Sequence, residues 1–260
     1  MGFIISTIAC VIALTLINKV GGKGERQLTK KTLIPLFFRG LAAAVVILIF
    51  CLVWNDDTFV TNLLGISNTS IVYLLIDNFL LTALVEEGFK YIALKTYLKK
   101  HDCIRCSHHA VVVATAVAAG FTAAENIFYL MGDVGVLLRI VFGITGHYAY
   151  AVYMGYNIAK EMQATDPAEK KKYRCRSFWI PVLLHGAFDF TCGFIQLDME
   201  ALLFLLILLV VIVVYVWFFI VSTIKMIKET SRAEMWENVG DTENSATTAT
   251  LPETNQSDIS

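Results

Sequence analysis

Seven long apolar runs are the feature that most constrains this chain. A bilayer-spanning helix needs about 20 mostly apolar residues, and only 17% of the 260 residues are Asp, Glu, Lys or Arg. So few charges exclude a disordered chain or a nucleic-acid binder. The sequence therefore predicts an all-α, polytopic membrane protein with about seven transmembrane helices. The runs cover residues 3–17, 33–54, 70–94, 110–131, 134–158, 178–195 and 201–224.

The basic residues orient these runs. All but three of the 21 Lys and Arg residues follow the first, third, fifth or seventh run. The other connections hold acidic residues and neither Lys nor Arg. This alternation obeys the positive-inside rule and predicts the N-terminus outside and the C-terminus inside. Residues 1–226 then form the transmembrane bundle, and residues 227–260, which are mostly polar and rich in Thr, Glu, Asn and Ser, are expected to be a disordered cytosolic tail.

Ionisable side chains inside the apolar runs must face one another or a water-filled cavity. Each costs about 2.5–3.5 kcal/mol at a helix centre, so a lipid-facing set would exceed the stability of an ordinary protein. A shared polar site between the helices is favoured over separate ion pairs or hydrogen bonds with a purely structural role. The residues concerned are Arg39, Asp77, Glu86, Glu87, Lys90, Glu125, Arg139, His147, His185 and Asp189.

The spacing of these residues indicates which of them share a helix face. Glu86 and Glu87 lie four and three residues before Lys90, so all three can meet. His185 and Asp189 are also four apart, so the carboxylate can orient the imidazole or share a metal ion with it. At 1.5 Å per residue, however, Glu86 lies about 24 Å from the outer end of its run, and Glu125 about 22 Å from the inner end of the next. The two are displaced toward opposite faces unless a helix is tilted or begins outside the hydrocarbon.

Four motifs in order on four successive runs resemble the PrsW family of intramembrane proteases, which is similar to the wider clan of CAAX-type prenyl endopeptidases and bacteriocin-immunity membrane proteins. One motif alone would be weak, whereas four in order are specific. The resemblance covers the third to sixth runs, within residues 70–195. The motifs are Glu86-Glu87-Gly88-Phe89-Lys90, Phe121-Thr122-Ala123-Ala124-Glu125-Asn126, His147 on the fifth run, and His185-Gly186-Ala187-Phe188-Asp189.

The resemblance implies an endopeptidase that cuts a membrane-anchored protein, such as an anti-sigma factor, within or near the bilayer. It implies a multi-pass protein of the plasma membrane that acts in regulated proteolysis. Carried over residue by residue, the candidate catalytic residues are Glu86, Glu87, Lys90, Glu125, Asn126, His147, His185 and Asp189.

Two mechanisms remain open under this resemblance. In the metal version, His147 and His185 hold Zn²⁺ together with Glu125 or Asp189, and Glu86 or Glu87 is the general base. In the metal-free version, one of those two glutamates deprotonates water directly, aided by the histidines. Asn126 is a candidate oxyanion donor in both versions.

Other functions would also use buried carboxylates and histidines. A proton-coupled transporter or channel relays protons through such groups, but the sequence has no internal repeat and no pair of interrupted runs. A catalytically silent membrane binding protein is the second alternative, although all four motifs are present. The loop pair Cys103 and Cys106 has a spacing seen in zinc clips, but ordinary loop residues are favoured. No nucleic-acid partner is expected at a net charge of −1.

Overall fold

All regular secondary structure in the described residues is helical. The computed structural model describes residues 2–21, 26–54, 61–63, 65–129, 139–195 and 216–236, together with residues 206, 210, 213 and 214. The predicted all-α class is therefore confirmed. The elements are α1 (Gly2–Val20), α2 (Lys30–Trp54), α4 (Ile71–Leu75), the π-helix η2 (Ile76–Ala83), α5 (Leu84–Leu98), α6 (Ser107–Tyr129), the π-helix η3 (Arg139–Ile144), α8 (Thr145–Gln163), α9 (Pro167–Ile195), the π-helix η4 (Val216–Ser222) and α11 (Thr223–Arg232).

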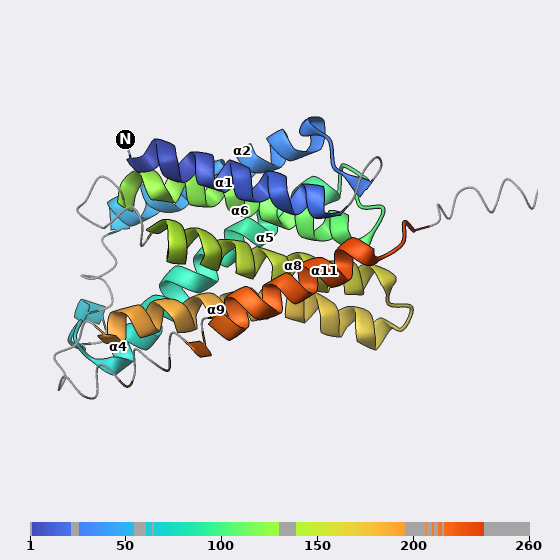
Figure 1. Ribbon diagram of the computed structural model, residues 1–260. Helices are drawn as coiled ribbons and strands as arrows, with labels where there is room; N and C mark the ends of the chain where they lie inside the picture. The colour runs from blue at the N-terminus through green and yellow to red at the C-terminus, as the bar shows by residue number, and fades with distance from the viewer. Residues whose placement is uncertain are drawn as a thin grey trace, which may run out of the picture.

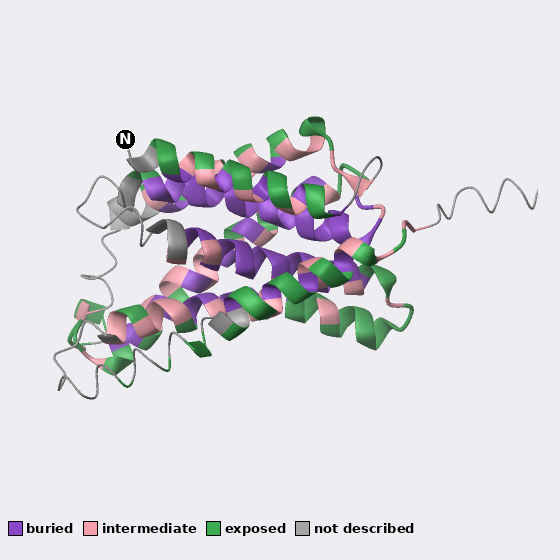
Figure 2. Cartoon of the chain, in the orientation of Figure 1, coloured by how far each residue is buried: buried purple, intermediate pink, exposed green. Residues whose placement is uncertain are grey.

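Helix α6 is the centre of the bundle. Residues 106–126 are all buried, and the buried surface in Figure 2 concentrates on α6 and α8. Helices α1 and α2 pack against one side of α6, and α8 packs against the other. Helix α9 lies beyond α8, and α11 packs against α8, α6 and α1 (Figure 1).

Glycines allow the helix backbones around α6 to touch. A Cβ added at Gly120 would lie 1.8 Å from the carbonyl oxygen of Phe37 on α2, and one at Gly40 would lie 1.8 Å from that of Val117 on α6. At Gly155 of α8, an added Cβ would lie 2.5 Å from the carbonyl oxygen of Ala110. Small residues thus permit close packing along α6.

The third predicted run is one continuous helical stretch from Ile71 to Leu98 with a π-helical middle. It begins at Ser70, whose hydroxyl accepts a hydrogen bond from the Tyr73 amide at 3.1 Å. π-helical turns are rare and occur often at functional sites. The stretch runs obliquely from α4 at the lower left to α5 in the middle of the bundle (Figure 1).

Among the described residues, two helices are long and apolar enough to cross a bilayer, at Lys30–Ile49 and Ser107–Ile127, and the apolar segment Ile4–Val20 is shorter. The outer faces of α1 and α2 carry exposed apolar side chains, among them Leu16 at 58% and Phe38 at 59%. A bilayer would cover such faces. The count of seven spans goes beyond these observations.

Two helix boundaries differ from the predicted ones. Helix α9 begins at Pro167, so the basic residues 170–176 form its first turns rather than a loop. Exposed Lys and Arg are good helix formers, which explains the extension. Helix α11 continues to Arg232, past the predicted end of the bundle at residue 226, because Met226 and Thr230 are buried on its inner face. Residues 237–260 of the predicted tail lie outside the described residues.

We predict that Gly120→Val lowers the thermal stability of the protein in detergent. The α2 and α6 backbones would have to separate, and overpacking typically costs about 1–3 kcal/mol. Gly88→Ala is the matched control, because the nearest atom to its new Cβ is 4.0 Å away, on the Phe178 ring. Equal melting temperatures for the two variants would contradict the close contact between α2 and α6.

Candidate active site

Helix α5 places two carboxylates around one ammonium group. Lys90 Nζ lies 2.7 Å from Glu87 Oε1 and 3.4 Å from Glu86 Oε2. The Lys90 and Glu87 side chains are 4% and 1% exposed, and that of Glu86 is 12% exposed. The predicted sharing of one helix face by these three residues is therefore seen.

The carboxylate of Glu87 is contacted by side chains from two helices. Its Oε1 accepts hydrogen bonds from Lys90 of α5 and lies 3.0 Å from His185 Nδ1 of α9. His185 is brought this close because the next residue is Gly186, where an added Cβ would lie 2.5 Å from the Phe79 ring of η2. A larger residue there would push α9 away from η2 and α5.

Lys90 also reaches the helices on its other side. Its Nζ lies 3.1 Å from His147 Nδ1 of α8, and 3.9 Å from the centre of the Phe121 ring of α6. An ammonium over an aromatic face is attracted to the ring electrons, and the attraction is stronger away from water. The single lysine of the site therefore contacts three helices.

The remaining carboxylates each hold one imidazole. Glu125 Oε2 of α6 lies 2.6 Å from His147 Nε2. Asp189 Oδ2 lies 3.0 Å from His185 Nε2, one turn further along α9. The two imidazole rings meet edge to face, with 5.2 Å between their centres.

The structure thus joins every predicted site residue except Asn126 into one buried network across α5, α6, α8 and α9. The side-chain amide of Asn126 donates a hydrogen bond to Ser6 of α1 instead. Arg39 lies outside the network, since it bonds Thr96 at 3.1 Å and ties α2 to α5. Asp77 lies in η2, and the side chain of Arg139 is outside the described residues.

Sequence reasoning missed two side chains at this site. The Tyr150 ring stacks on His185 at 4.8 Å and an interplanar angle of 18°, and meets the edge of His147 at 5.9 Å. Tyr150 is three residues after His147, so the helical spacing was a signal for it. Ser6 gave no such signal, because it is a lone hydroxyl in an apolar run far away in the sequence.

Comparison with known proteins identifies the family. The sequence profile described as "PrsW family intramembrane metalloprotease" matches residues 29–220. The chain belongs to the PrsW family. It is thereby a membrane protein, and the predicted resemblance is confirmed.

Several curated relatives, each named Protease PrsW, are about one-third identical to the chain. The relative from Oceanobacillus iheyensis is 33% identical over 117 residues, which cover 44% of this chain and 54% of the relative. The relative from Clostridioides difficile is 32% identical over 120 residues, which cover 44% of this chain and 50% of the relative. The relative from Bacillus subtilis is 31% identical over 116 residues, which cover 44% of this chain and 52% of the relative. The matches span about half the length of these relatives. No solved structure matches the chain significantly.

A metal ion, which the PrsW family description implies, fits the donor atoms of the network. Glu86, His147 and His185 offer one atom each within 4.8 Å of one another, and no other group of three such donors is found in the described part of the chain. Two imidazoles and a carboxylate are a common donor set of catalytic zinc sites. The sequence had placed Glu125 or Asp189 in this set with the two histidines; Glu125 lies 2.6 Å from His147 Nε2, and Asp189 3.0 Å from His185 Nε2.

The charge of the network supports the same fit. Carboxylates outnumber the ammonium group of Lys90 four to one. Buried charge is costly unless it is balanced, and a divalent cation would balance part of this excess. His147 has a carboxylate at one nitrogen, an arrangement that orients metal-binding histidines in proteins. His185 has a carboxylate near each nitrogen, Glu87 at Nδ1 and Asp189 at Nε2.

The segment Cys103–His109, a loop that leads into the first turn of α6, does not gather a second set of ligands among its described side chains. His109 Nδ1 accepts a hydrogen bond from the Arg105 amide, and the His101 ring lies 4.3 Å from the Tyr97 ring. Burial raises the pKa of the Cys103 thiol, aided by the charge of Asp102, which disfavours the thiolate that binds zinc. These contacts agree with the interpretation favoured from the sequence, in which Cys103 and Cys106 are ordinary loop residues and not a zinc clip.

We predict that Glu87→Gln destabilises the protein more than Glu86→Gln. Glu87 is the closer and more buried partner of Lys90, and it also holds His185. Breaking a buried pair typically costs about 3–5 kcal/mol. Thermal unfolding of both purified variants in the same detergent measures the difference. Equal stability of the two variants would contradict the assigned role of Glu87.

Proposed function

We propose that the protein is an intramembrane endopeptidase that hydrolyses a peptide bond of a membrane-anchored protein. One observation carries the proposal: carboxylates and imidazoles from four different helices converge on one buried cluster. A structural ion pair needs only two such groups, whereas amide hydrolysis needs several. The relatives named Protease PrsW support the same activity.

Glu86, His147 and His185 are the residues that would hold a divalent metal ion, with Zn²⁺ the proposed ion. When bound, such an ion supplies a Lewis acid that polarises the peptide carbonyl and makes water more acidic. Glu125 and Glu87 fix the orientation of the two imidazoles. Glu87 is too buried and too firmly bonded to act as the base, so its role is positioning.

Proton transfer falls to Asp189 in this arrangement. Its side chain is 26% exposed, against 12% or less for the other carboxylates of the network. It accepts a proton from the attacking water and returns it to the amine nitrogen as the carbon–nitrogen bond breaks. The Lys90 ammonium favours negative charge that develops in the site.

The substrate is proposed to be a protein with a membrane anchor, such as a regulator of the anti-sigma-factor kind. The enzyme lies in the plasma membrane with seven spans, the N-terminus outside and the C-terminus inside, as the distribution of its basic residues predicts. The oblique path of η2 and α5 is consistent with a span whose polar middle faces the bundle rather than lipid.

The proposed activity predicts specific cleavage products in the membrane proteome. Cells expressing the wild type should contain fragments of particular single-pass proteins that are missing from cells expressing Glu86→Gln at matched abundance. Glu169→Gln is the control, because it makes the same change at an exposed carboxylate of α9. Quantitative proteomics of fragment ends measures the result. Indistinguishable fragment sets, at rest and under stress, would exclude proteolysis.

The proposed metal site predicts about one zinc ion per chain in protein purified without a His tag or chelator. The double variant His147→Ala with His185→Ala should lose this ion, whereas His101→Ala should keep it, because His101 lies on the exposed loop. Elemental analysis measures the content. Cleavage by metal-free protein would exclude the metal mechanism and assign the general base to Glu86.

A further inference from the structure

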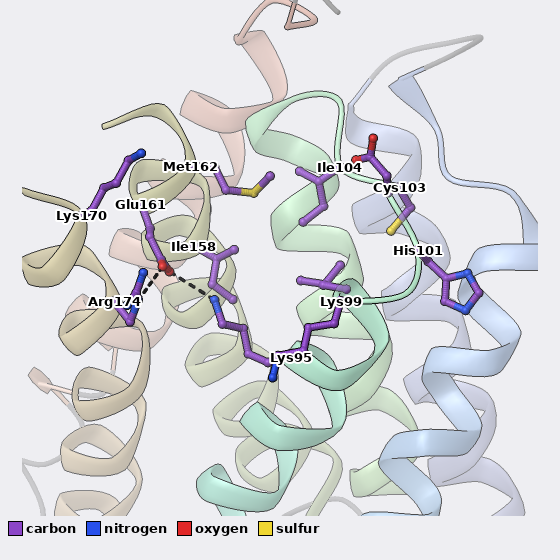
Figure 3. Close-up of a pocket in the computed structure, with 12 residues that line it drawn as sticks. Lys95, Lys99, His101, Cys103, Ile104, Ile158, Glu161, Met162, Lys170 and Arg174 are labelled. Atoms are coloured by element: carbon purple, nitrogen blue, oxygen red, sulfur yellow. Dashed lines mark hydrogen bonds and ion pairs between the residues drawn. The ribbon is translucent and has the colours of Figure 1, made fainter. Parts of the chain in front are cut away.

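A second polar site lies at the end of the bundle where the basic segments meet. A cavity of about 410 Å³ opens between the end of α5, the loop before α6, the end of α8 and the start of α9. Figure 3 shows Lys95, Lys99, Lys170 and Arg174 around its wall. These residues are far apart in the sequence, and only the fold brings them together.

Two of the four basic residues share one carboxylate inside the cavity. Glu161 of α8 lies 3.3 Å from Lys95 Nζ and 2.7 Å from Arg174 Nε, the contacts drawn as dashed lines in Figure 3. The second acidic residue of the wall, Asp102, pairs with Arg105 at 2.5 Å. Both carboxylates of the cavity are therefore already bound by protein cations.

The ammonium groups of the other two basic residues are available to a ligand. Lys99 and Lys170 are exposed, and neither makes an ion pair or side-chain hydrogen bond with the described residues. Between them the wall is apolar, formed by Leu98, Ile158 and Met162. Lysines that make no ion pair with the described residues, beside an apolar wall, suit a ligand with an anionic headgroup and an apolar chain.

The surroundings of the cavity favour a lipid as the source of that anion. Ile92 is 58% exposed three residues before Lys95, and Trp179 is 50% exposed five residues after Arg174. An exposed tryptophan beside exposed aliphatic side chains is typical of the membrane interface. The cavity thus lies at the boundary between the exposed apolar surface of the bundle and its basic end.

We propose that this cavity binds a phosphate-bearing anion, with Lys99 and Lys170 as its cationic contacts and the headgroup of an acidic phospholipid as its source. Basic pockets between helices on the cytoplasmic side are known to take such headgroups. The proposal does not depend on the proposed protease activity, because none of its residues belongs to the catalytic network.

The test compares two double variants of the full chain in nanodiscs. Lys99→Gln with Lys170→Gln removes the two uncommitted charges of the cavity. Lys100→Gln with Lys171→Gln removes the same charge from the same two segments but outside the wall. Native mass spectrometry measures retention of dioleoylphosphatidylglycerol against dioleoylphosphatidylcholine, and a titration with sodium phosphate measures competition.

The cavity variant should retain phosphatidylglycerol at least about fivefold more weakly than the wild type, because this is the loss expected when the attraction of one lysine to an acidic lipid surface is removed. The control variant should match the wild type. Weak competition by sodium phosphate assigns the site to the lipid, and strong competition assigns it to a soluble phosphate. Equal losses in both variants would show diffuse attraction and overturn the proposal. A wild type that does not prefer phosphatidylglycerol would overturn it as well.

Discussion

The buried ammonium group of Lys90 is the contact on which the site depends. It lies among Glu86, Glu87 and His147 and over the Phe121 ring, so it joins three helices. A charge taken out of water is unfavourable unless it is paired and hydrogen-bonded. Each partner of Lys90 is held in turn by another group, which fixes their mutual positions. The geometry of the site follows from keeping one cation satisfied in an apolar bundle.

Close packing around α6 makes such a network possible. Because glycines let α2 and α8 approach α6 at backbone distance, the side chains of α6 have little freedom. Glu125 and Asn126 are consequently held by neighbours on α8 and α1. The polar network depends on this close packing, because a gap beside α6 would admit water and weaken every contact in the site.

The sequence predicted which residues meet but not at which level of the bundle. Motif order and helical spacing were enough for the pairs on one helix, such as Glu87 with Lys90 and His185 with Asp189. A count of residues along straight helices separated Glu86 from Glu125, whereas both lie in the same network. Glu86 is carried there by an oblique stretch with a π-helical middle. Helix tilt and π-helical turns depend on packing between elements, and spacing along the chain carries no signal for them. Ser6 was missed because a lone hydroxyl in a distant apolar run carries no signal of the residue that it will contact.

The site is closed on one side and accessible on the other. Toward α1 and α2, the contacts at Gly40 and Gly120 leave no space between the helices. Toward α9, the carboxylate of Asp189 is the most exposed group of the network. The ion pairs of Glu161 tie α5, α8 and α9 together nearer the end of the bundle, but Arg174 is largely exposed there, and exposed pairs contribute little stability. The helices that carry the histidines are therefore held more firmly at the site, where buried groups pair, than at the end of the bundle, where one partner of Glu161 is exposed.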